Sequence, residues 1–166
     1  MKTLFLFAAA IAITPLARSQ SKPITSDIKN AEGRSVGTAT LSEAPKGVKI
    51  KLDIKDLPPG QHSIHIHQVA KCDAPEFKTA GPHFGAAHAG HEAGAMPAGD
   101  IPNFSLIVAA DGTAHVSVVA PNVTMGAGDN SVFSNGGTSI VIHAAADPSA
   151  AAAPARIACA VVAKPE

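Results

Sequence analysis

Residues 48 to 54 read Val-Lys-Ile-Lys-Leu-Asp-Ile, so apolar and charged side chains alternate at every position. Successive side chains of a β-strand point to opposite faces, and this period of two predicts a strand with one buried and one solvated face. Leu57-Pro58-Pro59-Gly60 follows, and its prolines and glycine are typical of a turn. We expect one strand and one turn from this stretch.

Runs of the same kind recur along the rest of the chain. They are short, apolar at alternate positions and separated by turn residues, and no stretch keeps a helical period. The expected strands beyond the first are 24–29, 35–41, 62–68, 103–110, 113–120, 138–143 and 157–163. Asp111-Gly112, between two of them, suits the tight turn of an antiparallel hairpin. Seven or eight strands predict an all-β sandwich or closed barrel.

Two segments do not fit the strand pattern and are expected to be long loops. Residues 69–99 are rich in Gly, Ala, Pro and His, and residues 144–155 are rich in Ala. Loops of this length in a compact domain are usually functional or disordered. We expect function, because the first carries metal-ligand residue types and the second lies between a histidine and an arginine. A short helix or a plain spacer is the alternative for the alanines at 150–153.

The start of the chain is typical of a secretory signal. Lys2 supplies a positive charge, residues 4–13 are apolar, and Pro15 is followed by small residues. An apolar run of this length is half of what a bilayer requires, so no membrane-spanning segment is expected. We predict a signal peptide at 1–19, one domain at 20–166, and export to the periplasm or the extracellular space. An ordinary core helix is the alternative for the first residues.

Cysteine and charge content narrow the class of protein further. Two cysteines in an exported chain indicate one disulfide, Cys72 to Cys159, and two buried free thiols are the alternative. The chain has 13 basic and 13 acidic residues, and removal of Lys2 and Arg18 with the signal leaves 11 basic residues. A chain so near neutrality, with six Phe and no Trp or Tyr, is not expected to bind nucleic acid.

Histidine is unusually concentrated, since seven of the eight lie between His62 and His143. In Ser63-Ile64-His65-Ile66-His67 the period of two places both histidines on the same face of a strand, where they converge on one space. A solvated polar face would give the same pattern, so these five residues leave metal binding and simple exposure open.

Other histidines favour a metal. His143 ends the apolar run 139–142, and a buried imidazole has to be hydrogen-bonded or ligated. His83, His88 and His91 lie in the first long loop. Imidazoles alone fit copper, zinc, iron or nickel, and four nitrogens in a roughly planar array favour copper(II).

Five motifs, in this order, resemble those of the copper/zinc superoxide dismutases. They read Gly60-Gln61-His62-Ser63-Ile64-His65-Ile66-His67, Ala80-Gly81-Pro82-His83-Phe84, Ala98-Gly99-Asp100-Ile101-Pro102-Asn103, Val141-Ile142-His143 and Arg156-Ile157-Ala158-Cys159-Ala160. The likeness runs from about Ala31 to the C-terminus. It implies an eight-stranded, immunoglobulin-like Greek-key β-barrel with long metal-binding and active-site loops. It also implies conversion of superoxide to oxygen and hydrogen peroxide at a histidine-ligated copper.

The resemblance implies the ligands of two metals. For copper they are His65, His67, His83 and His143. For zinc they are His83, which bridges the two metals, His91 and Asp100.

The fourth zinc ligand departs from the family. The usual His-x-Gly-Asp is replaced by Pro97-Ala98-Gly99-Asp100, and a proline side chain cannot bind metal. His88 is a possible substitute, and a water ligand or an empty site are the alternatives. Met96 is a softer candidate for copper(I).

Asp147 matches the family aspartate that hydrogen-bonds a copper ligand and a zinc ligand, here His65 and His91. Such contacts fix the orientation of the imidazoles. A surface aspartate before Pro148 is the alternative.

Two residues are expected to act directly in the reaction. Arg156 matches the arginine beside the open copper position, where a permanently charged guanidinium attracts superoxide. His83 matches the bridging histidine that delivers a proton to the second superoxide. The loop 144–155 has no lysine, so attraction of the substrate rests chiefly on Arg156. His62 and His115 are expected to be structural.

Three rival interpretations remain open. A copper-buffering protein on the same fold would need neither Arg156 nor Asp147. A copper-only dismutase is made plausible by Pro97, although His91 and Asp100 are retained. A zinc hydrolase would need a general base, for which Glu92 is the nearby carboxylate. Nothing in the sequence chooses between a monomer and a homodimer.

Overall fold

The computed structural model describes residues 21–86, 96–146 and 154–165. Outside them lie the expected signal peptide at 1–19 and the side chains of His88, His91, Glu92 and Asp147. Among the described residues, no helix has the length and apolar character needed to cross a membrane.

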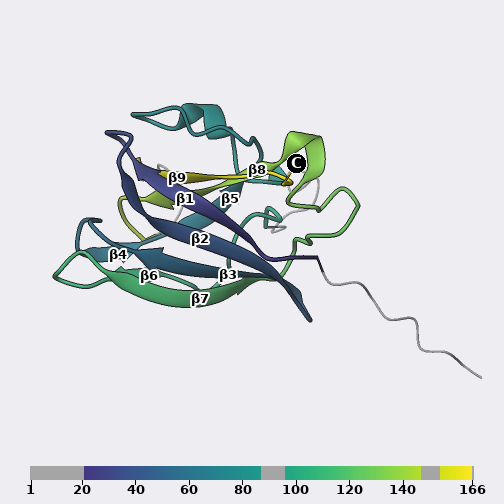
Figure 1. Cartoon of the computed structure of the whole chain (residues 1–166), viewed down its shortest axis with the longest axis horizontal. Helices are drawn as coiled ribbons and strands as arrows, with labels where there is room; N and C mark the ends of the chain where they lie inside the picture. Colours follow the sequence, from purple (N-terminus) through teal and green to yellow (C-terminus); the bar gives the residue numbers. More distant parts are fainter. Residues whose placement is uncertain (1–20, 87–95, 147–153, 166) are drawn as a thin grey trace, which may run out of the picture.

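This part of the chain contains nine strands and two short 3-10 helices (Figure 1). The strands are β1 (Ile24–Asn30), β2 (Ser35–Ala44), β3 (Gly47–Ile54), β4 (Gly60–His62), β5 (Ile64–His67), β6 (Leu106–Val108), β7 (Ala114–Ala120), β8 (Thr138–His143) and β9 (Arg156–Val162). The helices are η1 (Lys78–Ala80) and η2 (Ser134–Gly136). The all-β class predicted from the sequence is confirmed, and the expected eight strands agree roughly because the expected strand 62–68 is divided at Ser63 into β4 and β5.

Seven strands form one antiparallel sheet in the order β5-β8-β9-β1-β2-β3-β7, and β4 pairs with β6 in a smaller sheet. The chain runs directly from β1 through β2 to β3, but it then passes to β5 at the far edge of the large sheet. Crossings of this kind are characteristic of Greek-key folds. The large sheet curls round on itself, so that β5, β8 and β9 face β3 and β7 across the interior (Figure 1).

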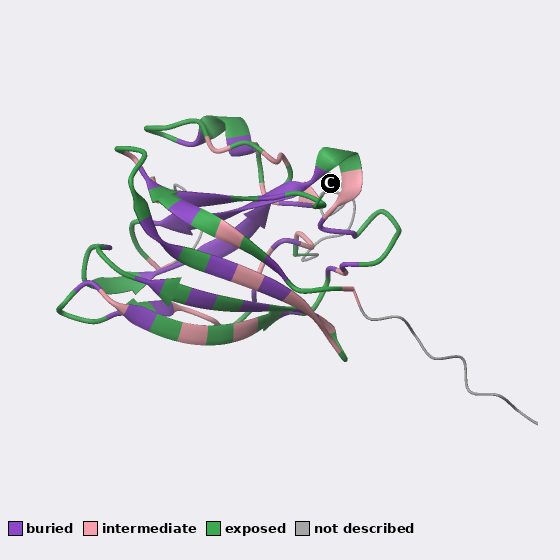
Figure 2. Ribbon diagram, in the orientation of Figure 1, coloured by how far each residue is buried: buried purple, intermediate pink, exposed green. Residues whose placement is uncertain are grey.

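The alternation in β3 explains how the sheet acquires its inner face. Val48, Ile50, Leu52 and Ile54 are at most 1% exposed, and the charged residues between them are exposed. β3 pairs with β2 on one side and β7 on the other, which places Ala39 and Val116 opposite Leu52. Full burial of each large aliphatic side chain contributes roughly 1.5–3 kcal/mol, so this pattern holds the register of the central strands. Figure 2 shows the resulting banding of buried and exposed residues along the strands.

The turn expected at Asp111-Gly112 is present. Gly112 has φ +82° and its N–H donates to the Ala109 carbonyl at 2.9 Å. The strands that it joins enter different sheets, because β6 pairs with β4 and β7 pairs with β3. The turn therefore connects the small sheet to the edge of the large one.

The outer face of β5, β8 and β9 is also buried, and it carries the polar residues of interest. Ile64 and Ile66 of β5 join the main core, whereas His65 and His67 point to the opposite face. In β8 and β9 the same face presents Val141 and Cys159. The segment after β5, which contains Cys72 and Phe77, covers this surface and is called the cover segment below.

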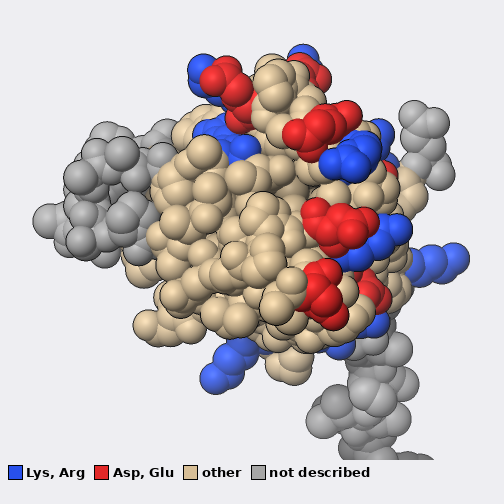
Figure 3. Space-filling model, turned by 90° about the vertical axis from the view of Figure 1, so that its left-hand side faces the viewer, with Lys and Arg blue, Asp and Glu red and all other residues tan. Residues whose placement is uncertain are grey.

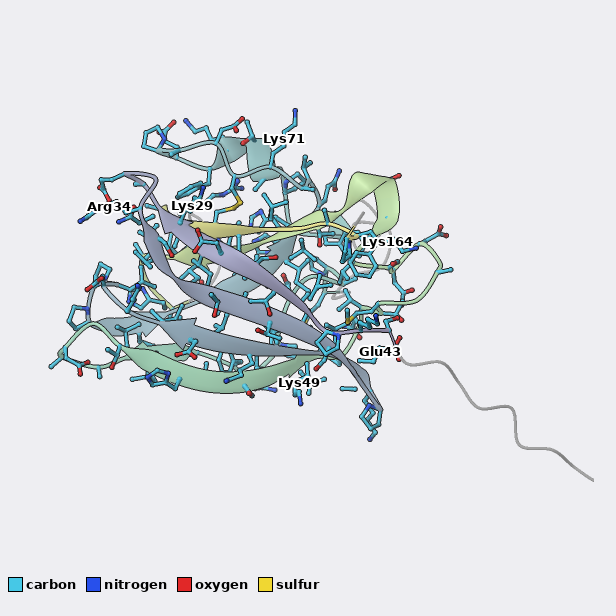
Figure 4. All side chains as sticks on the ribbon, in the orientation of Figure 1. Lys29, Arg34, Glu43, Lys49, Lys71 and Lys164 are labelled. Atoms are coloured by element: carbon cyan, nitrogen blue, oxygen red, sulfur yellow. A yellow bond between two sulfur atoms is a disulfide. The ribbon has the colours of Figure 1, made fainter. Side chains whose placement is uncertain are left out.

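A disulfide holds this cover in place. Cys72 and Cys159 are bonded, with their Cα atoms 5.6 Å apart, which confirms the predicted pair. Phe77, fully buried, packs with Val141 and Cys159 in a small second cluster. The bond closes a loop of 87 residues, and restriction of the unfolded chain by such a loop stabilises the fold by about 4–5 kcal/mol. The exposed charged side chains, among them Lys29 and Lys71, lie at the periphery (Figure 4).

Candidate metal centre

Four imidazoles from three parts of the chain converge on the outer face of β5 and β8. Each of them offers one ligand atom, and these four atoms lie within 4.8 Å of one another; the residues are His65, His67, His83 and His143. β5 and β8 are antiparallel with His65 opposite Val141, so His143, two positions further along, lies diagonally across from His65. The loop after η1 brings in His83, which forms an isolated bridge with His67.

Backbone carbonyls orient two of these rings. Nδ1 of His67 donates to the Gly81 carbonyl at 2.8 Å, and Nδ1 of His143 donates to the Pro154 carbonyl at 2.9 Å. A carbonyl can only accept, so the proton of each neutral ring is on Nδ1 and the lone pair is on Nε2. Within the described residues neither Nε2 has a hydrogen-bond partner, although both are buried. Buried nitrogens of this kind fit a metal ligand set.

Burial keeps these two histidines neutral. The pKa of His67 is lowered to about 3 and the pKa of His143 to about 4, chiefly because burial penalises the charged ring. The charges of neighbouring histidines and of Arg156 lower both values further. Neutral imidazole is the form that binds a metal, so burial holds these two rings in the form of a ligand.

Arg156 is tied to the same loop as the imidazoles. Its two terminal nitrogens donate to the carbonyls of Phe77 and Gly81, each at 2.7 Å. The Gly81 carbonyl thus accepts from both His67 and Arg156. Burial lowers the pKa of Arg156, but a guanidinium remains charged under all ordinary conditions.

Gly81 has to be a glycine for this arrangement. Its φ of +76° lies in the left-handed region, and a Cβ atom there would lie 3.0 Å from Cγ2 of Val69. Sequence inspection singled out Gly81 as part of a motif, but Phe77 and Pro154 were missed. Their contribution is a backbone carbonyl, for which the side-chain pattern carries no signal.

Asp100 lies beside His83, with its Oδ1 atom 2.6 Å from Nδ1 of the ring. The segment that carries it packs against β5: the Ile66 N–H donates to the Gly99 carbonyl, and the Gly99 N–H donates to the Phe84 carbonyl, both at 2.9 Å. A Cβ atom at position 99 would lie 2.1 Å from the Ile66 carbonyl oxygen, so a side chain cannot be accommodated.

The remaining predicted residues fall in three groups. His88, His91 and Asp147 lie outside the described residues. Met96 is 53% exposed, which gives no support for a copper ligand. His62 hydrogen-bonds the carbonyls of His143 and Pro58 at 2.8 Å and therefore ties β4 to the end of β8, as expected of a structural residue.

Comparison with known proteins identifies the family. The family model described as copper/zinc superoxide dismutase (SODC) matches residues 35–162. This chain belongs to the copper/zinc superoxide dismutase family.

Relatives and solved structures agree with this assignment. The chain is 40% identical to superoxide dismutase [Cu-Zn] 1 of Aquifex aeolicus over 82% of this chain and 85% of the relative. It is 38% identical to superoxide dismutase [Cu-Zn] of Caulobacter vibrioides over 83% of this chain and 84% of the relative. The crystal structure of a superoxide dismutase-like protein from Bacillus subtilis superposes with a TM-score of 0.74 at 26% identity, covering 83% of this chain and 97% of that one.

The low pKa values of His67 and His143 predict that the metal-free protein becomes less stable in acid. The unfolded state takes up protons on these histidines near pH 6.5, whereas the folded state takes them up at about 4 and about 3. The unfolded state therefore binds more protons below pH 6.5, and the free energy of unfolding should fall as the pH is lowered, by up to about 1.4 kcal/mol per pH unit for each histidine. Urea unfolding at several pH values measures this slope. His115→Gln, at an exposed histidine, should leave it unchanged, and a wild-type slope of zero would contradict the prediction.

The Gly81 geometry predicts a second result. Gly81→Ala should move the shared carbonyl and weaken copper(II) binding by about 10–100-fold, the usual effect of losing a hydrogen bond that orients a ligand. Gly33→Ala is the matched control, because Gly33 has a φ of +75° and a Cβ atom there would have no atom within 4 Å. Competition titration with a copper chelator measures both affinities. Equal affinities in the two variants would show that the carbonyl does not orient the site.

Proposed function

We propose that this chain is a superoxide dismutase that binds copper through His65, His67, His83 and His143. The observation that carries the proposal is the convergence of four imidazoles beside a fixed arginine, with the Gly81 carbonyl joining the two. A copper-storage protein needs the imidazoles but has no use for a guanidinium held against them. An anionic substrate gives that guanidinium a purpose.

The protein's contribution is geometry and charge. Copper, when bound, supplies the one-electron chemistry that converts two superoxide anions and two protons to oxygen and hydrogen peroxide. His67 and His143 present Nε2 because backbone carbonyls hold the opposite nitrogen. In His83, Nδ1 is engaged by Asp100, which leaves Nε2 as the atom that can bind copper.

Arg156 attracts and orients the substrate. The residue is half-buried, and besides contacting Phe77 and Gly81 it lines an open surface pocket of about 560 Å³ with residues of the β1–β2 and β6–β7 turns. An anion in solvent can therefore reach the guanidinium. In Figure 3 the acidic side chains lie along the right-hand side and the top of the view, most of them next to Lys or Arg, and the centre of that face carries no charged side chain. The same pocket is lined by Arg34 and by the carboxylates of Glu32, Asp56 and Asp111, and none of the four imidazoles lines it.

Zinc is the second metal of the family, and in this chain His83, His91 and Asp100 are the positions proposed to hold it. His88 is the proposed substitute for the histidine that Pro97 replaces. Asp147 is proposed to link His65 to His91. The proposed working form is the domain 20–166, exported to the periplasm or the extracellular space after loss of residues 1–19.

The proposal is tested by a superoxide dismutation assay on the disulfide-bonded protein. Metal-free protein should be inactive, zinc alone should give no activity, and copper(II) should restore activity in proportion to bound copper counted by elemental analysis. Tight copper binding without turnover would refute the enzymatic function and favour copper buffering. Activity with zinc alone would indicate a hydrolase-type site instead.

Arg156→Ala should lower kcat/KM at low ionic strength by about tenfold or more, because steering by a charge near the site is lost. The copper content should not change. The dependence of the rate on salt should flatten, since screening acts on the attraction that the variant lacks. Arg156→Lys should retain part of the rate, and Lys49→Ala, which removes an exposed charge on β3, should behave as the wild type. An unaltered rate in Arg156→Ala would refute the role.

A further inference from the structure

Asp100 and His83 make the closest polar contact of the described metal centre. Their Oδ1 and Nδ1 atoms are 2.6 Å apart, and the two side chains are 17% and 28% exposed. This distance is typical of a charge-assisted hydrogen bond between an N–H and a carboxylate. The proton of the bond belongs to Nδ1, because an ionised carboxylate can only accept.

The same distance does not suit two ligands of one zinc ion. Zinc binds nitrogen and oxygen at about 2.0–2.1 Å with tetrahedral angles, which places neighbouring ligand atoms about 3.3 Å apart. Zinc binding would have to remove the Nδ1 proton of His83 and separate the two atoms from 2.6 Å. The Pro97 side chain, at the position where the family has a histidine ligand, offers no donor atom, so His83 and Asp100 are the described residues at the zinc positions.

The backbone holds Asp100 in this position. The Asp100 N–H donates to the Pro97 carbonyl at 3.1 Å, and Gly99 is fixed between Ile66 and Phe84 by backbone hydrogen bonds. Ile66 lies between the two histidines of β5, so the carboxylate is placed relative to the strand that carries half of the imidazole cluster. These backbone hydrogen bonds set the position of Asp100 and do not involve a metal.

We propose that Asp100 is a positioning residue that holds His83 for copper through this hydrogen bond, so that the copper site takes its final form without zinc. The inference rests on the proposed copper site. The bond fixes the tautomer of His83 with the lone pair on Nε2, as carboxylate–histidine pairs do in other metal sites. In zinc-free protein, the two described side chains that are proposed to hold zinc thus support the copper ligand, and zinc binding would replace the proton between them.

Electron paramagnetic resonance of bound copper(II) tests the inference without relying on activity. The disulfide-bonded protein is stripped of metals and loaded with copper(II) alone or with copper(II) and zinc(II), and metal content is counted. The wild type should give the same spectrum and the same copper affinity in both cases. A spectrum that reaches its final form only after zinc is added would overturn the proposal.

Two substitutions separate a hydrogen-bond acceptor from a zinc ligand. Asp100→Ala should alter the copper spectrum and weaken copper binding by about 10–100-fold even in zinc-free protein. Asp100→Asn retains an oxygen that accepts from Nδ1 and should restore most of the wild-type spectrum and affinity, although an amide is a poor zinc ligand. Asp129→Asn, at an exposed aspartate in the β7–β8 connection, is the control. Unchanged copper binding in Asp100→Ala would refute the proposal.

The outcome is separable from that of the proposed function. Protein that binds copper with the expected dependence on Asp100 but does not dismute superoxide would refute the enzyme and leave the positioning role intact. Active protein whose copper spectrum does not change in Asp100→Ala would support the enzyme and refute the positioning role. Folding of each variant is checked by the urea unfolding midpoint, and Asp100→Asn covers the case in which Asp100→Ala does not fold.

Discussion

The carbonyl oxygen of Gly81 accepts two hydrogen bonds, one from His67 and one from Arg156. The first bond engages Nδ1 of His67 and so leaves Nε2 for the histidine cluster. The second bond positions the guanidinium of Arg156. Because both bonds end on one atom, the ring of His67 and the guanidinium of Arg156 are held beside each other. The left-handed φ of Gly81 is what turns this carbonyl toward both of them.

Much of the surrounding structure serves to hold that residue still. The disulfide fixes the cover segment to β9, and Phe77 packs beneath it against Val141. Phe77 therefore has two functions. Its ring anchors the loop, and its carbonyl accepts a hydrogen bond from the second terminal nitrogen of Arg156. A site on the outside of a curled sheet is exposed by default, and it becomes a buried site here because this covalent and apolar anchoring brings a loop over it.

Burial keeps two imidazoles of the site neutral, and backbone carbonyls orient them. His67 and His143 are desolvated and hence neutral, and their Nδ1–H groups donate hydrogen bonds to backbone carbonyls. His83 differs, because its partner is the carboxylate of Asp100 and lies at the edge of the cluster. The ring most exposed to solvent is thus the one held by a charge, which suits a residue that exchanges protons.

The sequence by itself determined the all-β class, the inward faces of the strands and the pairing of His65 with His67, because a period of two is a local property of the backbone. It also placed the two cysteines and, through the resemblance of five motifs, the set of four imidazoles. Only the tertiary structure decided which ring nitrogens are free, that Phe77, Gly81 and Pro154 hold the site through their carbonyls, and that Asp100 bonds to His83. Every residue has the same carbonyl group, so its role depends on where the fold points it, and a side-chain pattern carries no record of that direction.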